Sequence, residues 1–167
     1  MNRNLYVVMG ITGSGKSTVG AMLARKLGAD FVEGDDYHPQ ENVQRMGAGI
    51  PLTDEDRASW LSALAARIRD AHDAGTGLVV TCSALKRSYR DILRAAAPEL
   101  RFIFLNGQRL VISERLAQRR GHFMPASLLD SQLETLEEPS VDERAWAYDI
   151  GKSAQEIVDD IVARASA

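Results

Sequence analysis

The residues with the clearest chemistry form a glycine-rich run that ends in lysine and serine, from Gly10 to Ser17. This run fits the pattern G-x-x-x-x-G-K-[ST] at every fixed position, and it directly follows an apolar stretch from Leu5 to Met9. Glycines adopt backbone angles that are closed to other residues, so the amides of such a loop can turn inward around a phosphate group. In loops of this kind the lysine reaches the β- and γ-phosphates and the serine hydroxyl ligates Mg²⁺. We therefore expect ATP and Mg²⁺ as cofactors, with Lys16 in catalysis and Ser17 on the metal. The residues expected to bind the nucleotide here are Gly10, Ile11, Thr12, Gly13, Ser14, Gly15, Lys16, Ser17 and Thr18.

A second candidate is a carboxylate that follows the next apolar run, Phe31 to Glu33. Asp35 could orient an acceptor hydroxyl and take its proton late in phosphoryl transfer. We favour Asp35 over Asp36 because it comes two residues after Glu33 and would share its face if the strand continues. An ordinary Asp-rich turn is the alternative, and proximity to the phosphate loop favours the functional interpretation.

Cations follow a third apolar run, Leu78 to Thr81. A lysine in the first turn of a helix opposes the helix dipole, so Lys86 is expected to have another purpose, such as binding an anionic substrate. Arg90 is a weaker candidate, with a surface position as the alternative. No aspartate ends this run, so Mg²⁺ would depend on Ser17, on water and on a carboxylate from elsewhere.

An arginine-rich stretch, 115–125, is expected to form a lid. Arg115 and Arg119 would lie on one helix face, and Arg120 precedes a glycine hinge at Gly121. Guanidinium groups there could stabilise the charge of the transferring phosphoryl group, whereas a solvated basic face is the alternative. His38 and His122 could act as ligands or donors, but two lone histidines do not make a metal site.

Short apolar runs alternate with helical patterns, which predicts an α/β fold: a parallel sheet with helices on both faces. The expected strands are 5–9, 31–33, 78–81, 102–105 and a weaker 146–150. The expected helices include one opened by Thr53, then 85–97, 108–120, 125–136, and one opened by Ser153 with a capping box. Ligands of open α/β sheets bind beyond the carboxyl ends of the strands, so segments 34–60 and 115–125 are expected to hold and cover a second substrate.

Composition narrows the class of protein. A chain of 167 residues is expected to form a single domain over 1–167, here with a short lid. The net charge of −3 gives no support for a nucleic-acid surface, and no apolar run is long enough to cross a membrane. The single cysteine, Cys82, cannot form an internal disulfide, and no signal peptide is visible, so we expect a cytoplasmic protein.

Several motifs together resemble the bacterial-type gluconokinases, in collinear order from about Leu5 to Pro139. Besides the phosphate loop, the resemblance rests on Gly34-Asp35-Asp36-Tyr37-His38-Pro39, Gly49 to Arg57 with Trp60-Leu61, Cys82 to Lys86 with Tyr89-Arg90, and His122-Phe123-Met124-Pro125 with Leu128-Leu129 and Ser131-Gln132.

This resemblance implies the fold of shikimate and nucleoside-monophosphate kinases: three layers around a five-stranded parallel sheet of order 2-3-1-4-5, with a mobile lid. It implies phosphorylation of D-gluconate by ATP, and a homodimer. By position, Asp35 would be the base, Arg115 would lie near the adenine, and Arg119 or Arg120 would close on the phosphates, with Arg120 the candidate catalytic residue. The expected substrate-binding residues are Asp35, His38, Arg57, Lys86, Arg90 and His122. The alternatives are a kinase for another hydroxy acid such as shikimate, or a nucleotide-dependent switch.

Overall fold

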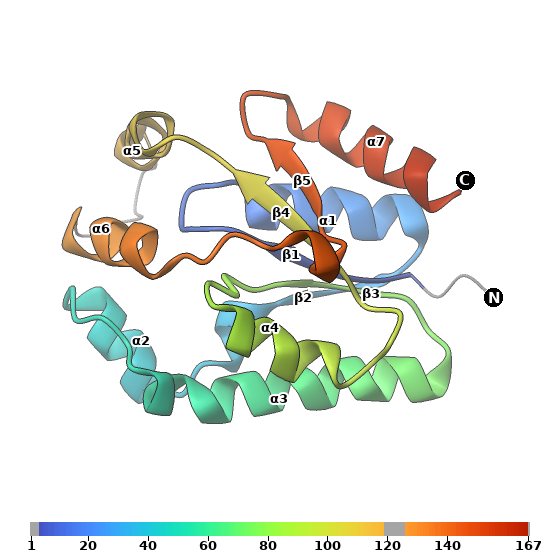
Figure 1. Ribbon diagram of the computed structural model, residues 1–167, viewed down its shortest axis with the longest axis horizontal. Coiled ribbons are helices and arrows are strands. Elements are labelled where there is room, and N and C mark those ends of the chain that lie inside the picture. The colour runs from blue at the N-terminus through green and yellow to red at the C-terminus, as the bar shows by residue number, and fades with distance from the viewer. Residues whose placement is uncertain (1–3, 119–125, 167) are drawn as a thin grey trace.

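Five parallel strands form the centre of the protein in the computed structural model, which describes residues 4–118 and 126–166 (Figure 1). The strand order is β2-β3-β1-β4-β5, which confirms the expected topology. Every residue of β1 and β3 is buried, as expected for central strands covered on both faces. The strands are β1 Leu5–Met9, β2 Asp30–Glu33, β3 Leu78–Thr81, β4 Arg101–Asn106 and β5 Trp146–Asp149.

Helices cover both faces of this sheet, and three further helices gather beyond one end of it (Figure 1). Helices α1 and α7 pack together on one face, and α3 and α4 pack together on the other. Helices α2, α5 and α6 lie near the end of the sheet where β1 leads into α1. The bounds are α1 Lys16–Leu27, α2 Gln40–Gly47, α3 Asp54–Ala74, α4 Arg87–Arg94, α5 Arg109–Gln118, α6 Ala126–Thr135 and α7 Ala154–Ala165, with short 3₁₀ turns η1 Gly34–Tyr37 and η2 Val141–Glu143.

Local sequence signals fix the ends of the longest helix. The Thr53 hydroxyl accepts a hydrogen bond from the Asp56 amide at 3.1 Å, and the Asp56 carboxylate accepts one from the Thr53 amide at 2.9 Å. This reciprocal pair starts α3, and Gly75 ends it in a left-handed conformation with φ of 72°. At the start of α7 the Ser153 hydroxyl accepts a hydrogen bond from the Glu156 amide, as expected. The Glu156 carboxylate accepts a hydrogen bond from the Ser153 hydroxyl and not from the Ser153 amide, so the expected capping box is incomplete.

Helix α4 begins later than the sequence pattern predicted. The expected helix started at Leu85, whereas α4 starts at Arg87 and Lys86 is the N-cap residue in an extended conformation. Ala84, just before it, has a φ of +46°, which a helix cannot contain. The expectation for Lys86 was wrong in this respect, because Lys86 lies before the first turn of α4 and does not oppose the helix dipole from within it.

In the two described stretches, no helix combines the length and the apolar character needed to span a lipid bilayer.

Candidate active site

The glycine-rich loop joins β1 to α1 at the carboxyl edge of the sheet. Gly10, Gly13 and Gly15 have φ values of 151°, 80° and 96°, a region that disfavours residues with a side chain. The Lys16 ammonium lies over this loop and donates to the carbonyls of Gly10 at 2.9 Å and Ile11 at 3.1 Å. Because α1 begins at Lys16, the amides of its first turn and its positive dipole end face the loop.

The loop forms one wall of a pocket of about 370 Å³. The opposite wall comes from the ends of β2 and β3, so the sheet brings Lys16, Ser17 and Asp35 to one cavity as expected. The lining residues are Thr12, Gly13, Gly15, Lys16, Ser17, Glu33, Asp35, Asp36, Thr81 and Cys82. Burial raises the pKa of the Cys82 thiol to about 12, so this side chain stays protonated and is not a nucleophile.

Asp35 stands on a turn that is fastened to β3. The Gly34 amide donates to the Thr81 hydroxyl at 3.2 Å, and that hydroxyl donates to the Glu33 carboxylate at 2.9 Å. The indole Nε1 of Trp60 donates to the Gly34 carbonyl at 2.8 Å. A Cβ atom at position 34 would lie 1.9 Å from the Thr81 carbonyl oxygen, so only glycine fits there. The backbone that carries Asp35 is thus rigid, while its side chain is 80% exposed.

His38 lies behind Asp35 and is not among the residues that line the pocket. Its side chain is only 3% exposed, and its ring stacks on Trp60 with 3.9 Å between centroids and an angle of 18°. Burial lowers the pKa of His38, which favours the neutral imidazole. The expectation that His38 lines the sugar-acid pocket therefore has no support in this geometry.

Arg57 and Lys86 meet at the ring of Tyr89, although they come from different parts of the chain. The Lys86 ammonium lies 5.7 Å from the ring centroid, and the Arg57 guanidinium lies 5.3 Å from it. Arg57 donates to the Tyr89 hydroxyl at 3.0 Å, and both Lys86, at 3.1 Å, and the Tyr89 hydroxyl donate to Asp54. These hydrogen bonds, first from Tyr89 and then from Lys86, hold the pKa of the Asp54 carboxyl below its ordinary value. The two expected cations therefore form one cluster that already holds a carboxylate.

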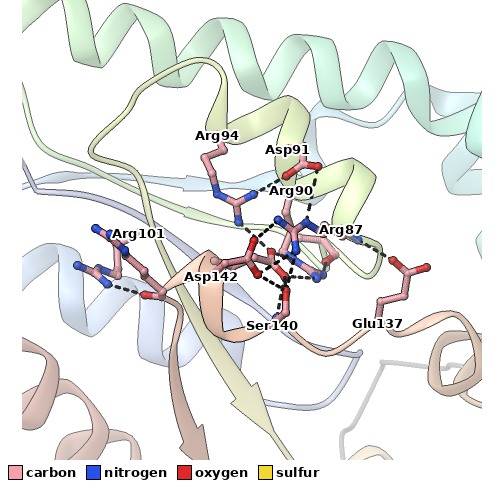
Figure 2. A network of polar contacts seen from close by, with 11 residues as sticks. Arg87, Arg90, Asp91, Arg94, Arg101, Glu137, Ser140 and Asp142 are labelled. Carbon is pink, nitrogen blue, oxygen red and sulfur yellow. Dashed lines mark hydrogen bonds and ion pairs between the residues drawn. The ribbon is translucent and has the colours of Figure 1, made fainter.

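Arg90 points away from this cluster and is a correction to the expected site. Its side chain is 1% exposed, and it donates to the Glu143 carboxylate at 2.6 and 3.1 Å and to the Ala84 carbonyl at 2.9 Å. Figure 2 shows this network, in which arginines of α4 point toward the segment around Ser140 and Asp142. Arg90 is neither a surface residue nor a pocket residue, and it instead joins α4 to η2. No sequence pattern indicated this pair, because Glu143 lies beyond Pro139, where the family resemblance ends.

A second cavity, of about 180 Å³, lies on the other side of the phosphate loop. Gly15 lines both cavities, and Arg115 lines the second. The Arg115 guanidinium is fixed there by donating to the Ile150 carbonyl at 2.6 Å. The lining residues are Ser14, Gly15, Thr18, Val19, Arg115, Ile150, Lys152, Ser153, Ala154 and Ile157. Lys152 and its neighbours were not expected at the site, and they reach it because they connect β5 to α7, which packs against α1.

Helix α6 also reaches the phosphate loop. The Gln132 side-chain carbonyl accepts a hydrogen bond from the Thr12 amide at 2.7 Å. Gln132 belongs to the Ser131-Gln132 motif, and the resemblance alone does not indicate this contact. The remaining arginine and histidine candidates, Arg119, Arg120 and His122, lie outside the described residues. Among the residues that the structure describes, no group of three or more His, Cys, Asp or Glu side chains could hold a metal.

Comparison with known proteins agrees with this geometry. A family described as an AAA domain matches residues 5–139. A gluconokinase from Gluconobacter oxydans is 52% identical over 137 residues, which cover 82% of this chain and 77% of that protein. The thermoresistant gluconokinase of Escherichia coli is 44% identical over 85% of this chain and 81% of its own length.

Solved structures give the same result. A crystal structure of a gluconokinase from Sinorhizobium meliloti is 49% identical, with a TM-score of 0.88 over 98% of this chain and 91% of that one. Shikimate kinase from Aquifex aeolicus, at 19% identity and a TM-score of 0.60 over 95% of this chain and 94% of that one, shares the fold. With relatives this similar over most of its length, the chain belongs to the gluconokinase family of phosphate-loop kinases.

Proposed function

We propose that this protein transfers the γ-phosphoryl group of ATP to the 6-hydroxyl of D-gluconate. The observation that carries the proposal is that the phosphate loop and Asp35 line the same pocket. In the reaction a bond forms between the acceptor oxygen and the γ-phosphorus, and the bond from that phosphorus to the β–γ bridging oxygen breaks. The hydroxyl proton passes to Asp35, and ADP leaves with the electron pair of the broken bond.

The two cavities divide the nucleotide between them. The β- and γ-phosphates bind the loop amides and Lys16, and the adenine occupies the smaller cavity beside Arg115. Gly15 lines both cavities and has no side chain to separate them, so one bound nucleotide can extend from the first cavity into the second. The dipole of α1 and the Lys16 ammonium then stabilise the charge that grows on the phosphates during transfer.

Magnesium fits the same wall of the pocket. The Ser17 hydroxyl lies in the first turn of α1 and lines the cavity, where it can ligate a cation held by the phosphates. When bound, this ion neutralises phosphate charge. In this proposal Arg119 or Arg120 adds positive charge at the transferring phosphoryl group, with Arg120 as the catalytic candidate and Arg119 and His122 as additional ligand contacts.

The sugar acid binds in segment 34–60 and against the Tyr89 cluster. Arg57 lies one turn before Trp60 on α3, and the Trp60 indole is bonded to Gly34 in the turn that carries Asp35, so the helix brings Arg57 toward the acceptor side of the cavity. The substrate carboxylate binds Arg57 and Lys86 and competes there with Asp54. This competition gives the pocket a way to prefer an acid over an uncharged sugar.

The test is ADP formation by the purified protein with and without gluconate. Gluconate should accelerate it, and acceleration only by another hydroxy acid, such as shikimate, would assign a different acceptor. ADP formation that no acceptor accelerates would instead favour the nucleotide-dependent switch.

The candidate base has a neighbouring control. Asp35→Asn should lower kcat by about 100-fold or more with little change in ATP binding, whereas Asp36→Asn should lower it far less. Equal effects of the two substitutions would mean that the acidic turn acts only through its charge.

The homodimer, the single-domain organisation and the cytoplasmic location remain parts of this proposal. Light scattering during gel filtration measures the mass of the particle, and a monomer at micromolar concentration would contradict the proposed homodimer.

A further inference from the structure

His38 is a buried imidazole directly behind the candidate base. Its Nε2 lies 4.0 Å from Oδ1 of Asp35, which is beyond hydrogen-bond distance but within reach of a side-chain rotation. The stacked Trp60 fixes the plane of the imidazole ring, and Trp60 is itself held by the Gly34 carbonyl. The orientation of His38 is therefore tied to the same turn that carries Asp35.

Asn42 determines which ring nitrogen of His38 carries the proton. Asn42 is 4% exposed, and its Nδ2 donates to the Asp56 carbonyl at 2.8 Å. The same Nδ2 lies 3.3 Å from Nδ1 of His38. The Asp56 carbonyl can only accept, so the Asn42 side chain must turn its NH₂ group toward both Asp56 and His38. This NH₂ group can only donate a hydrogen bond to the His38 ring. Nδ1 must therefore accept, and in a neutral ring the single N–H is then on Nε2, toward Asp35.

The surrounding groups keep the ring neutral. Burial is the main reason that the pKa of His38 is lowered, Asp35 on η1 opposes this, and Arg57 on α3 adds to it. While Asn42 donates to Nδ1, the neutral ring keeps its proton on Nε2, so Nε2 acts as a donor and not as an acceptor.

We propose that His38 is a positioning residue for Asp35 and that Asn42 sets its tautomer. When the acceptor is bound, the Nε2–H donates to one oxygen of the Asp35 carboxylate, and the other oxygen remains for the acceptor hydroxyl. An exposed aspartate samples several rotamers, and a fixed donor selects the one that faces the substrate. This inference rests on the proposed function, because it takes Asp35 as the base.

The tautomer can be measured without turnover. In ¹⁵N-labelled protein, Nε2 of His38 should show the chemical shift of a protonated ring nitrogen and Nδ1 that of an unprotonated one. Asn42→Ala should produce a mixture of tautomers. A wild-type ring with the proton on Nδ1 would overturn the inference.

Two substitutions of His38 separate the ring nitrogens. The amide nitrogen of His38→Gln can reach about the position of Nε2, whereas that of His38→Asn reaches only the position of Nδ1. Both remove the imidazole ring from its stack on Trp60, so the loss of the stack does not distinguish them. His38→Asn should lower kcat at least about tenfold with a smaller change in the KM for gluconate, and His38→Gln should keep most of the kcat. Equal losses, or a change in KM alone, would contradict a positioning role.

A double variant completes the test. In an Asp35→Asn background, His38→Asn should cause little further loss of kcat, because the group it positions is already gone. An independent, multiplicative loss would show that His38 acts elsewhere and would overturn the inference while leaving Asp35 as the base. A wild-type protein without gluconate-dependent turnover would reject the proposed function, and the positioning role with it, although the tautomer assignment could still be read by NMR.

Discussion

Replacing Arg90 by Met should destabilise the protein strongly, because it breaks a buried ion pair and leaves one charge behind. Arg90 and Glu143 have side chains that are each 1% exposed. The substitution removes two hydrogen bonds to the Glu143 carboxylate and one to the Ala84 carbonyl. Glu143 keeps bonds from Arg94 and from the Ser140 amide, so its charge is only partly compensated.

The expected magnitude follows from this arrangement. Removing one partner of a buried ion pair costs about 3–5 kcal/mol, and a domain of this size loses about 2–4 °C in Tm for each kcal/mol. Arg90→Met should therefore lower Tm by about 6–20 °C, while the methionine still fills the space of the aliphatic stem. Urea unfolding followed by circular dichroism gives the free energy of unfolding directly.

The same helix provides a matched control. Arg87 pairs with Asp142, the neighbour of Glu143, but these two side chains are 44% and 63% exposed. Solvent screens such a pair, so Arg87→Met should change the unfolding midpoint very little. If Arg87→Met and Arg90→Met lower the unfolding midpoint equally, burial does not explain the stabilisation by the Arg90–Glu143 pair, and this prediction is wrong.

Three further predictions concern the loop, acid stability and the turn that carries Asp35. Lys16→Ala should lower kcat by at least a few hundredfold, about 3 kcal/mol or more, while the thermal melt stays close to that of the wild type. Burial raises the pKa of Glu143, but hydrogen bonds from Arg90, the Ser140 amide and Arg94 outweigh this and lower the pKa to about 2. The ionised Glu143 should therefore stabilise the fold fully above its unfolded pKa of about 4.3, and this stabilisation should be lost as the pH falls toward 2. Urea unfolding midpoints measured between pH 6 and 2 should depend less on pH in Glu143→Gln than in the wild type. Trp60→Phe removes the donor to the buried Gly34 carbonyl, so it should cost about 1–3 kcal/mol in unfolding free energy and lower kcat, and unchanged kinetics would mean that the turn does not need this bond.

Features with local signals were predictable from the sequence. The phosphate loop, the starts of α3 and α7, and the strand runs depend on spacing, capping residues and apolar periodicity, all of which are short-range. The strand order came from the family resemblance, and the structure confirms it.

Long-range pairings were not predictable in the same way. Arg90 was expected in the pocket or at the surface because its partner, Glu143, lies on a distant segment that gives no local signal. Helix α4 starts two residues late because the Leu85 carbonyl is engaged by the Glu137 amide at 2.7 Å instead of by the helix. His38 was expected in the pocket wall, and only the three-dimensional position of Trp60 shows that it is buried behind it.

The position of β1 at the centre of the sheet has a consequence for the order of events during synthesis. When β1 leaves the ribosome it has neither of its neighbours, since Leu5 pairs with Leu78 and Met9 with Phe104. Pairings between such distant parts of a chain form slowly, and a nascent chain folds only with the residues already made. The space beside Gly10 is bounded by the Leu105 carbonyl of β4, so the nucleotide loop cannot reach its final shape before β4 has emerged. Although the loop ends at Ser17, the nascent chain gains its final shape only after β4, which ends at Asn106, has been translated.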